Sequence, residues 1–263
     1  MLDGIGIFLQ RLKNCEQGDV DTVISRADQV GLTWLAVKSG SAYRDNQWTP
    51  AIAKDFITRC HDTGIQVLTW HVSRPDTAAA EIQHILGSFE DGVDGHIVNA
   101  ESAWDGRDEE AELFMSRLRS KLGADKFLAH MPFAIASRHR NFPYAEFGKY
   151  CDAVMPQCSW VEMGLSMTEA ADAMDKGFAA LAKSSPESVK PIYPAGSSSG
   201  SGFTTDDMAA FIKRYRGCYP SLNRYDGTAP ETFEALRKLY DAGELDQDPE
   251  PEVDTAPEEP IEL

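Results

Sequence analysis

The hydrophobic and polar positions follow two periodicities that alternate along most of the chain. Short apolar runs, typical of buried strands, are followed by longer segments whose apolar residues recur every three or four positions, typical of amphipathic helices. Turn and capping residues such as Gly31, Gly64 and the pair Thr49-Pro50 separate the segments. The pattern predicts strands at 4–10, 33–39, 65–71, 94–101, 126–131, 152–157, 190–193 and 218–223. It predicts helices at 19–30, 49–61, 76–89, 108–122, 143–150, 168–183, 204–215 and 230–242.

Eight strand-helix units, spaced by roughly 30 residues, are typical of an α/β fold of the TIM-like (β/α)8 barrel type. A doubly wound open sheet is the alternative, but it usually has fewer strands and a glycine-rich phosphate turn after the first one. Here Gly4 and Gly6 lie inside the first predicted strand. We therefore expect one barrel domain over residues 1–243 and a disordered, acidic, proline-rich tail over 244–263.

Charge narrows the classes of partner. The net charge of −17 argues against binding to nucleic acid or to anionic membrane surfaces. Nine of the acidic residues lie from Glu244 onward, where Lys and Arg are absent. The tail could therefore dock a protein partner.

The sequence shows no targeting or membrane-spanning segment. The N-terminus lacks a basic region followed by an apolar run, and no apolar stretch is long enough to cross a bilayer. We expect a protein made in the cytoplasm, without a signal peptide and without membrane insertion. If it acts outside the cell, it would be virion-associated or released by a non-classical route.

The five cysteines and six histidines show no spacing typical of a metal site or a disulfide framework. We expect reduced thiols, no metal and no cofactor.

The candidate chemistry lies at the end of the fourth predicted strand. Asn99 and Glu101 are two residues apart and point to the same side of that strand. Barrel enzymes place their sites at the C-terminal ends of strands, and a carboxylate there is costly unless it is hydrogen-bonded or functional. The alternative is a Glu that emerges into solvent as the strand ends.

Four stretches together resemble the family-25 glycoside hydrolases, the lysozyme-type muramidases. Residues 37–43 (Val-Lys-Ser-Gly-Ser-Ala-Tyr) resemble "K-A-T-E-G-x-x-Y", and 70–75 (Trp-His-Val-Ser-Arg-Pro) resemble "Y-H-F-A-R-P". Residues 98–101 occupy the place of a "D-x-E" strand, and 222–228 resemble "D-x-N-x-F-x-G-T". The resemblance implies a metal-free TIM-like barrel that cleaves the β-1,4 bond after N-acetylmuramic acid in peptidoglycan.

The sequence departs from that family at its acidic positions. Family carboxylates fall at Gly6, Gly40-Ser41, Asn99 and Ser221, so only Glu101 remains. Most glycosidases need two carboxylates, but a 2-acetamido group on the sugar can replace the nucleophile. Glu101 would then serve as general acid and base, with Asn99 holding the acetamido group. Residues 94–101 also resemble the "D-G-x-x-x-N-x-E" segment of endo-β-N-acetylglucosaminidases, which work in this way.

Other predicted strand-end residues are candidates for substrate binding. Their aromatic rings would stack on sugars, and their polar groups would bind sugar hydroxyls. Lys38 would also pair with Glu101 across the barrel opening. The alternative for each residue is ordinary packing or a solvated position at a strand end. A glycine- and serine-rich loop at 196–202 is expected to be a mobile rim loop, and Asp105 would be a second carboxylate or a solvent-facing loop residue. The candidates are Lys38, Trp70, His71, Trp104, Gln157, Trp160, Tyr193 and Asn223.

These patterns predict a glycoside hydrolase acting on an N-acetylated glycan, with peptidoglycan favoured, of the kind found in phage endolysins that degrade cell walls. The alternative is a catalytically inactive glycan-binding or structural barrel that has lost its acids, such as a phage tail or lysin component. The retained Glu101 favours the first, and the missing carboxylates favour the second.

Overall fold

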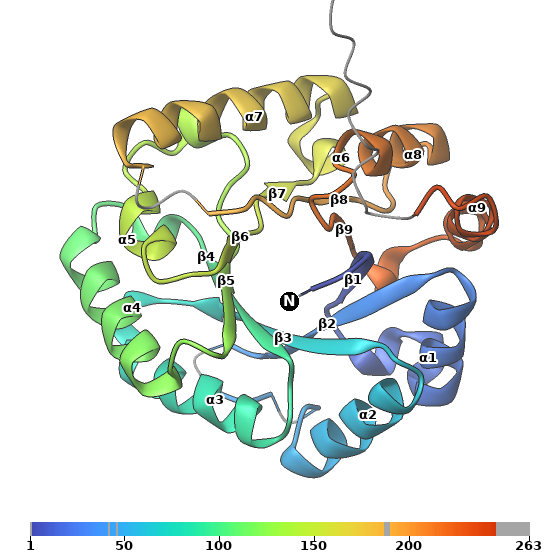
Figure 1. The fold of residues 1–263 in the computed structure, drawn as a ribbon, viewed down its shortest axis with the longest axis horizontal. Coiled ribbons are helices and arrows are strands. Elements are labelled where there is room, and N and C mark those ends of the chain that lie inside the picture. Colours follow the sequence, from blue (N-terminus) through green and yellow to red (C-terminus); the bar gives the residue numbers. More distant parts are fainter. Residues whose placement is uncertain (1, 42, 46, 187–189, 246–263) are drawn as a thin grey trace, which may run out of the picture.

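A computed structural model describes residues 2–41, 43–45, 47–186 and 190–245. Nine parallel strands form one sheet in the order β6-β5-β4-β3-β2-β1-β9-β8-β7, which curls into a barrel (Figure 1). The strands are β1 (Ile5–Leu9), β2 (Leu32–Gly40), β3 (Gln66–Ser73), β4 (Gly95–Ala100), β5 (Phe127–His130), β6 (Ala153–Val154), β7 (Gln157–Cys158), β8 (Ala195–Ser197) and β9 (Ser221–Asn223). The predicted α/β barrel is confirmed.

The nine strands occupy eight positions of the barrel because β6 and β7 are two pieces of one strand. β6 pairs with β5, β7 pairs with β8, and only Met155 and Pro156 separate them. The Met155 amide donates to the His130 carbonyl (2.8 Å), and the Ala195 amide donates to the Pro156 carbonyl (3.0 Å). Backbone hydrogen bonds thus continue through the break and close the ring.

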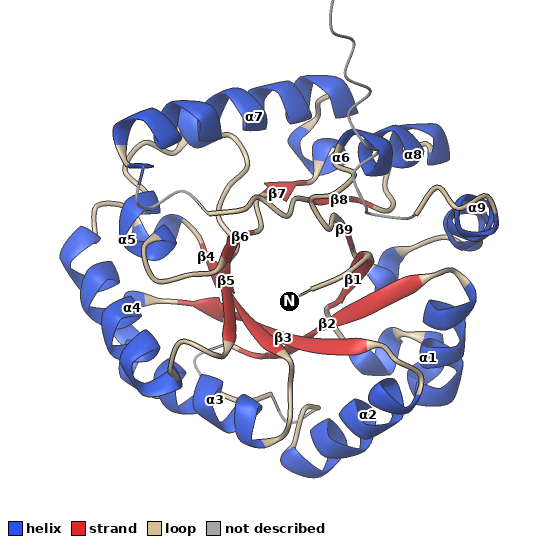
Figure 2. Ribbon diagram, in the orientation of Figure 1, coloured by secondary structure: helices blue, strands red, loops and turns tan. Residues whose placement is uncertain are grey.

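Helices surround the strands on the outside (Figure 2). They are α1 (Val20–Gln29), α2 (Pro50–Asp62), α3 (Ala78–Glu90), α4 (Asp108–Leu122), α5 (Tyr144–Gly148), α6 (Trp160–Met163), α7 (Met167–Ser184), α8 (Thr205–Arg214) and α9 (Pro230–Asp241). Side chains cap several of them. The Asp19 carboxylate accepts from the Thr22 amide at the start of α1, and Ser166 and Glu169 form a reciprocal capping box at the start of α7.

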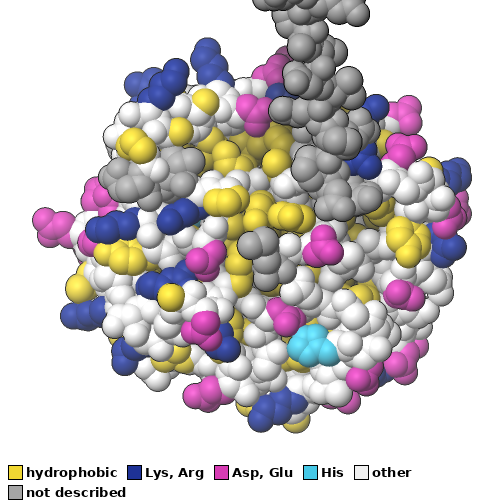
Figure 3. All heavy atoms as spheres, in the orientation of Figure 1, with side chains coloured by type: hydrophobic (Ala, Val, Ile, Leu, Met, Phe, Trp, Pro, Cys, Tyr) yellow, Lys and Arg dark blue, Asp and Glu magenta, His cyan; other side chains and the backbone are white. Residues whose placement is uncertain are grey.

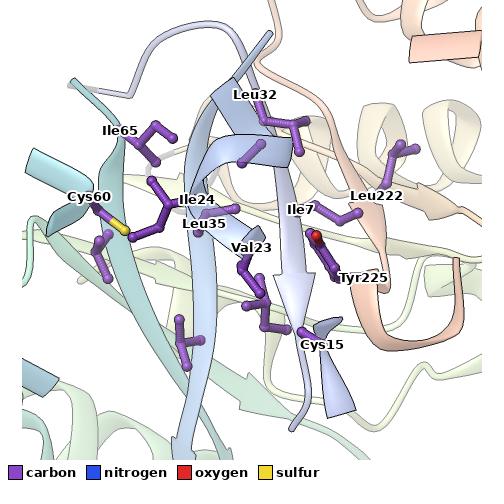
Figure 4. Packing of buried hydrophobic residues seen from close by; sticks show 14 of the residues in the cluster. Ile7, Cys15, Val23, Ile24, Leu32, Leu35, Cys60, Ile65, Leu222 and Tyr225 are labelled. Carbon is purple, nitrogen blue, oxygen red and sulfur yellow. The ribbon is translucent and has the colours of Figure 1, made fainter. Parts of the chain in front are cut away.

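The core has an outer and an inner layer. The outer layer packs helices against the sheet, as Val23 and Ile24 of α1 do against Leu35 (Figure 4). The inner layer fills the barrel and contains Phe8, Trp34, Trp70, Tyr193 and other apolar side chains. In the space-filling view, hydrophobic side chains gather at the centre of the barrel end turned to the viewer, and charged side chains are spread over the surrounding helices (Figure 3).

The seventh predicted strand, 190–193, is wrong in position. The strand at this place is β8, Ala195–Ser197, and Ile192 makes only an isolated bridge with Val154. Pro191 and Pro194 have no amide hydrogen to donate to a neighbouring strand, which interrupts regular pairing before Ala195. The predicted rim loop therefore begins inside a strand, where Gly196 packs against the rings of Trp160 and Phe211.

The barrel continues slightly beyond its predicted boundary. Leu245, assigned to the tail by the sequence, is buried against the outer core layer. The rest of the predicted disordered tail, 246–263, lies outside the described residues. Among the residues that the structure describes, no helix is long and apolar enough to cross a membrane.

Candidate functional site

The alternation of side chains along each strand decides which residues enter the barrel. On β4, Ile97 belongs to the inner core layer and Val98 to the outer layer, so Asn99 and then Glu101 share the inward side with Ile97. The same argument places Lys38 of β2, Trp70 of β3, Gln157 of β7 and Asn223 of β9 on the inward face. The strand ends meet at one opening, which we call the barrel mouth.

Three inward side chains form a hydrogen-bonded cluster at the barrel mouth. Asn99 Nδ2 donates to Glu101 Oε1 (3.2 Å), and Gln157 Nε2 donates to the same oxygen (3.3 Å). Gln157 Nε2 also lies 3.2 Å from Asn99 Oδ1. Two amide groups therefore hold Glu101 through Oε1, which leaves Oε2 as the oxygen available for proton transfer.

Glu101 opens into a cavity of about 340 Å³ at the barrel mouth. Its side chain is partly exposed, whereas Asn99 beneath it is buried. The cavity is lined by Glu101, Phe133, Ala134, Ile135, Arg138, His139, Gln157, Ser159, Glu162 and Met163. The structure thus brings Glu101 and Gln157 together in one open site, with Asn99 supporting both.

Lys38, Trp70 and Asn223 lie on the inward face but do not line this cavity. In the described part of the chain Lys38 forms no ion pair with Glu101, contrary to the expectation, and its Nζ lies 5.0 Å from the centre of the Trp70 ring. Trp70 is largely buried, and its Nε1 donates to the Leu9 carbonyl (3.2 Å). Trp70 therefore serves mainly to pack the inner core layer.

His71 lies outside the barrel interior, contrary to the predicted substrate-binding role. It is fully buried, and its Nε2 is hydrogen-bonded to Glu81 Oε2 of α3 (3.1 Å). Its Nδ1 is hydrogen-bonded to His96 Nε2 (2.8 Å), and His96 Nδ1 to Thr69 Oγ1 (2.8 Å). Burial holds the pKa of His96 well below its usual value, so a neutral His96 ring joins Thr69 to His71, and Glu81 accepts at the end of the chain.

The remaining bonds of Glu81 hold the loop that follows β3. Its carboxylate accepts from Ser73 Oγ (2.6 Å), the Arg74 amide (2.8 Å) and Thr77 Oγ1 (2.7 Å). Burial opposes ionisation of Glu81, but the hydrogen bond from His71 and these further donors leave its pKa below the usual value. His71 and Glu81 therefore fix a loop near the barrel mouth without reaching the site.

Trp104 and Trp160 are not at the barrel mouth either, which corrects two further predictions. Trp104 is fully buried, stacked on Phe114 of α4 with ring centres 5.5 Å apart. Trp160 packs on Phe211 of α8 (5.2 Å) and is almost fully buried. Both follow a strand end, but the chain folds them back into the helix layer, where neither can stack on a sugar.

Tyr193 was predicted to lie at the barrel mouth, but it lies at the opposite end of the barrel, where the strands begin. Because β8 begins only at Ala195, Tyr193 precedes the strand, and its ring packs edge-on against Tyr219, which precedes β9 (5.1 Å). These rings close the end at which the strands begin.

The loop after β5 lines the cavity, although no residue of this loop was predicted from the sequence to belong to the site. Phe133 and His139 in this loop stack nearly parallel, with ring centres 3.6 Å apart, and form one wall of the cavity beside Arg138. Flat aromatic surfaces of this kind suit the apolar face of a sugar ring. The loop has no periodicity to identify it, although every loop at the C-terminal end of a barrel strand is a candidate.

Comparisons with known proteins support the fold alone. No family model matches the chain, and the curated proteins contain no significant match. A chitinase from Bacteroides thetaiotaomicron is 11% identical, with 91% of this chain and 95% of that chain covered and a TM-score of 0.67. The endo-β-1,4-mannanase from Thermotoga petrophila is 11% identical (92% and 78% covered, TM-score 0.65), and the spore cortex-lytic enzyme SleL of Bacillus cereus is 10% identical (89% and 73%, TM-score 0.61). The chain therefore has a glycoside hydrolase-like (β/α) barrel fold.

Proposed function

We propose that the protein is a glycoside hydrolase acting on an N-acetylated glycan, with peptidoglycan the favoured substrate. The observation that carries the proposal is Glu101, held by two amides at the barrel mouth and open to a cavity of about 340 Å³. The cavity also has an aromatic wall, as carbohydrate sites commonly do. The chitinase and the spore cortex-lytic enzyme share the fold, and the four muramidase-like stretches favour a relation to family 25.

In this proposal Glu101 Oε2 gives a proton to the leaving oxygen of the glycosidic bond and later takes one from water. The carbonyl oxygen of the 2-acetamido group attacks C1, which replaces the nucleophile that the strands lack. Asn99 and Gln157 hold Glu101 through its other oxygen. Such an enzyme would suit a phage-type lysin.

A catalytically inactive glycan-binding barrel is the second candidate. It is favoured by the replacement of the family's strand-borne carboxylates at Gly6, Asn99 and Ser221. A protein of this kind would keep the cavity and bind glycan without cleaving it.

Hydrolysis of purified peptidoglycan, followed by turbidity or dye release, separates the two candidates. We expect wild-type protein to release soluble fragments and Glu101→Gln to lose activity by at least about 10²-fold, because the acid is removed. Glu146→Gln, on α5 and outside the cavity, serves as the matched control. Glycan binding without hydrolysis by the wild type would support the inactive barrel.

A further inference from the structure

A second carboxylate lines the cavity that contains Glu101. Glu162 lies on the short helix α6, directly after β7, and its side chain is exposed. Within the described part of the chain it forms no ion pair or hydrogen bond, whereas Glu101 is held by Asn99 and Gln157. The sequence pattern gave no reason to connect Glu162 with β4, because 61 positions separate it from Glu101.

The amide of Asn99 is already engaged within the site. Its nitrogen donates to Glu101 Oε1 at 3.2 Å, and its oxygen accepts from Gln157 Nε2 at 3.2 Å. Asn99 is also buried, with 6% of its surface exposed. It is therefore placed to hold Glu101, and the acetamido group of a substrate needs another partner.

The two carboxylates come from different elements around the same cavity. Glu101 stands at the end of β4, Glu162 on α6, and no hydrogen bond joins them. Phe133 with its stacked partner His139, together with Ile135 and Met163, supplies apolar lining in the same cavity. A sugar ring lying against this lining can present its glycosidic oxygen to one carboxylate and its 2-substituent to the other.

We propose that Glu162 accepts the N–H of the 2-acetamido group and so selects N-acetylated sugars. This inference rests on the proposed hydrolase function. Glu162 is the suitable partner because a carboxylate is an acceptor only, forms a strong hydrogen bond with a donor that becomes positively charged, and here has no competing partner in the described residues.

The chemistry balances with the groups present. The acetamido oxygen bonds to C1 while the bond from C1 to the leaving oxygen breaks, and that oxygen takes the proton of Glu101. The N–H proton passes to Glu162, which leaves a neutral oxazoline. Water then adds to C1 and gives a proton to Glu101, the bond from C1 to the acetamido oxygen breaks, and Glu162 returns its proton to nitrogen. C1 is attacked twice, so its configuration is retained.

The test compares full-chain wild type with Glu162→Gln, Glu162→Ala and Glu101→Gln, with Glu146→Gln as control. Rates are measured on an N-acetylated oligosaccharide, and affinity is measured for the thiazoline analogue of N-acetylglucosamine, which resembles the oxazoline. We expect Glu162→Gln to lower kcat on the order of 10²-fold with KM nearly unchanged. We expect Glu162→Ala to weaken thiazoline binding at least about 10-fold, while Glu101→Gln retains it.

The outcomes distinguish this inference from the proposed function. Wild-type kcat in Glu162→Gln, or a product of inverted configuration by NMR, would overturn the role of Glu162 while leaving the hydrolase in place. If the wild type cleaves nothing, the proposed hydrolase function fails, but thiazoline binding still tests the proposed contact between Glu162 and the acetamido N–H. Thiazoline binding that is lost in Glu162→Ala supports this contact, and the absence of thiazoline binding by the wild type overturns it.

Discussion

The side-chain nitrogen of Gln157 lies 3.3 Å from Glu101 Oε1, across the gap between β7 and β4. The sequence suggested that Gln157 binds sugar hydroxyls, but this bond makes it a positioning residue for Glu101. We predict that Gln157→Leu lowers kcat by about 10-fold with little change in KM, because Glu101 loses one of the two donors that orient it. Steady-state kinetics on an N-acetylated oligosaccharide measure this, with Gln83→Leu on the exposed side of α3 as control. A rise in KM at constant kcat would instead restore the sugar-binding role.

The buried pair of His71 and Glu81 makes a second prediction. Glu81→Ala leaves His71, Ser73 and the Arg74 amide without their acceptor, so we expect the free energy of unfolding to fall by about 3–5 kcal/mol. Urea denaturation measures it. His61→Ala is the control, because His61 pairs with Asp94 where 42% of its side chain is exposed, and its loss should cost no more than about 1 kcal/mol. Equal costs for the two variants would show that the Glu81 network adds nothing.

Buried histidines predict an acid-sensitive fold. Burial lowers the pKa of His130 to about 3, and burial followed by the charge of His71 lowers the pKa of His84 to about 3. In an unfolded chain both would titrate near pKa 6.5. The unfolded state therefore takes up protons first as the pH falls, and the free energy of unfolding should decrease from about pH 6.5 down to about pH 3.

His130→Phe tests this pH dependence. Neither ring nitrogen of His130 has a hydrogen-bond partner in the described residues, and its ring stacks on Phe147 (5.6 Å), as a phenylalanine ring could. At pH 5 we expect the variant to be more stable than wild type by about 1–3 kcal/mol. Urea midpoints between pH 7 and pH 4 should also fall less steeply in the variant. Parallel curves would mean that His130 does not titrate on unfolding.

The close contact of Gly6 with Trp34 makes the last prediction. A Cβ on Gly6 would lie 2.0 Å from the Trp34 ring, so Gly6→Ala should lower the free energy of unfolding by about 1–3 kcal/mol. Trp34→Leu should relieve the clash. The free energy of unfolding lost in the double variant should therefore be smaller, by about 0.5–3 kcal/mol, than the sum of the losses in the two single variants. Thermal or urea unfolding of the four proteins completes the cycle, and strict additivity would contradict the contact.

Much of the fold could be predicted from the sequence because local signals specify it. The capping residues Asp19 and Thr49 fixed helix starts within a residue, and apolar runs located most strands. The exception at 190–193 followed from two prolines that suppress strand pairing without removing the apolar pattern. Both prolines are visible in the sequence, but the prediction followed the apolar pattern and gave no weight to their missing amide hydrogens.

The site was predicted less completely, for two physical reasons. Trp70 and His71 are adjacent in a strand, so alternation allows only one of them to face the barrel interior, whereas the sequence-based prediction placed both in the site. Trp104 and Trp160 follow strand ends, where the chain can turn over the barrel mouth or back toward the helices. That choice depends on partners such as Phe114 and Phe211, which are distant in sequence or unmarked by any motif.

The packed interior of the barrel has a consequence for the route of a ligand. Phe8, Trp34 and Trp70 fill the middle, and Tyr193 with Tyr219 closes the end at which the strands begin. No polymer can thread through such a plug. In the proposed hydrolase, a glycan bound at the barrel mouth would therefore lie across it, so cleaved halves would depart by the way the intact chain arrived, and their release would compete with arrival of the next one.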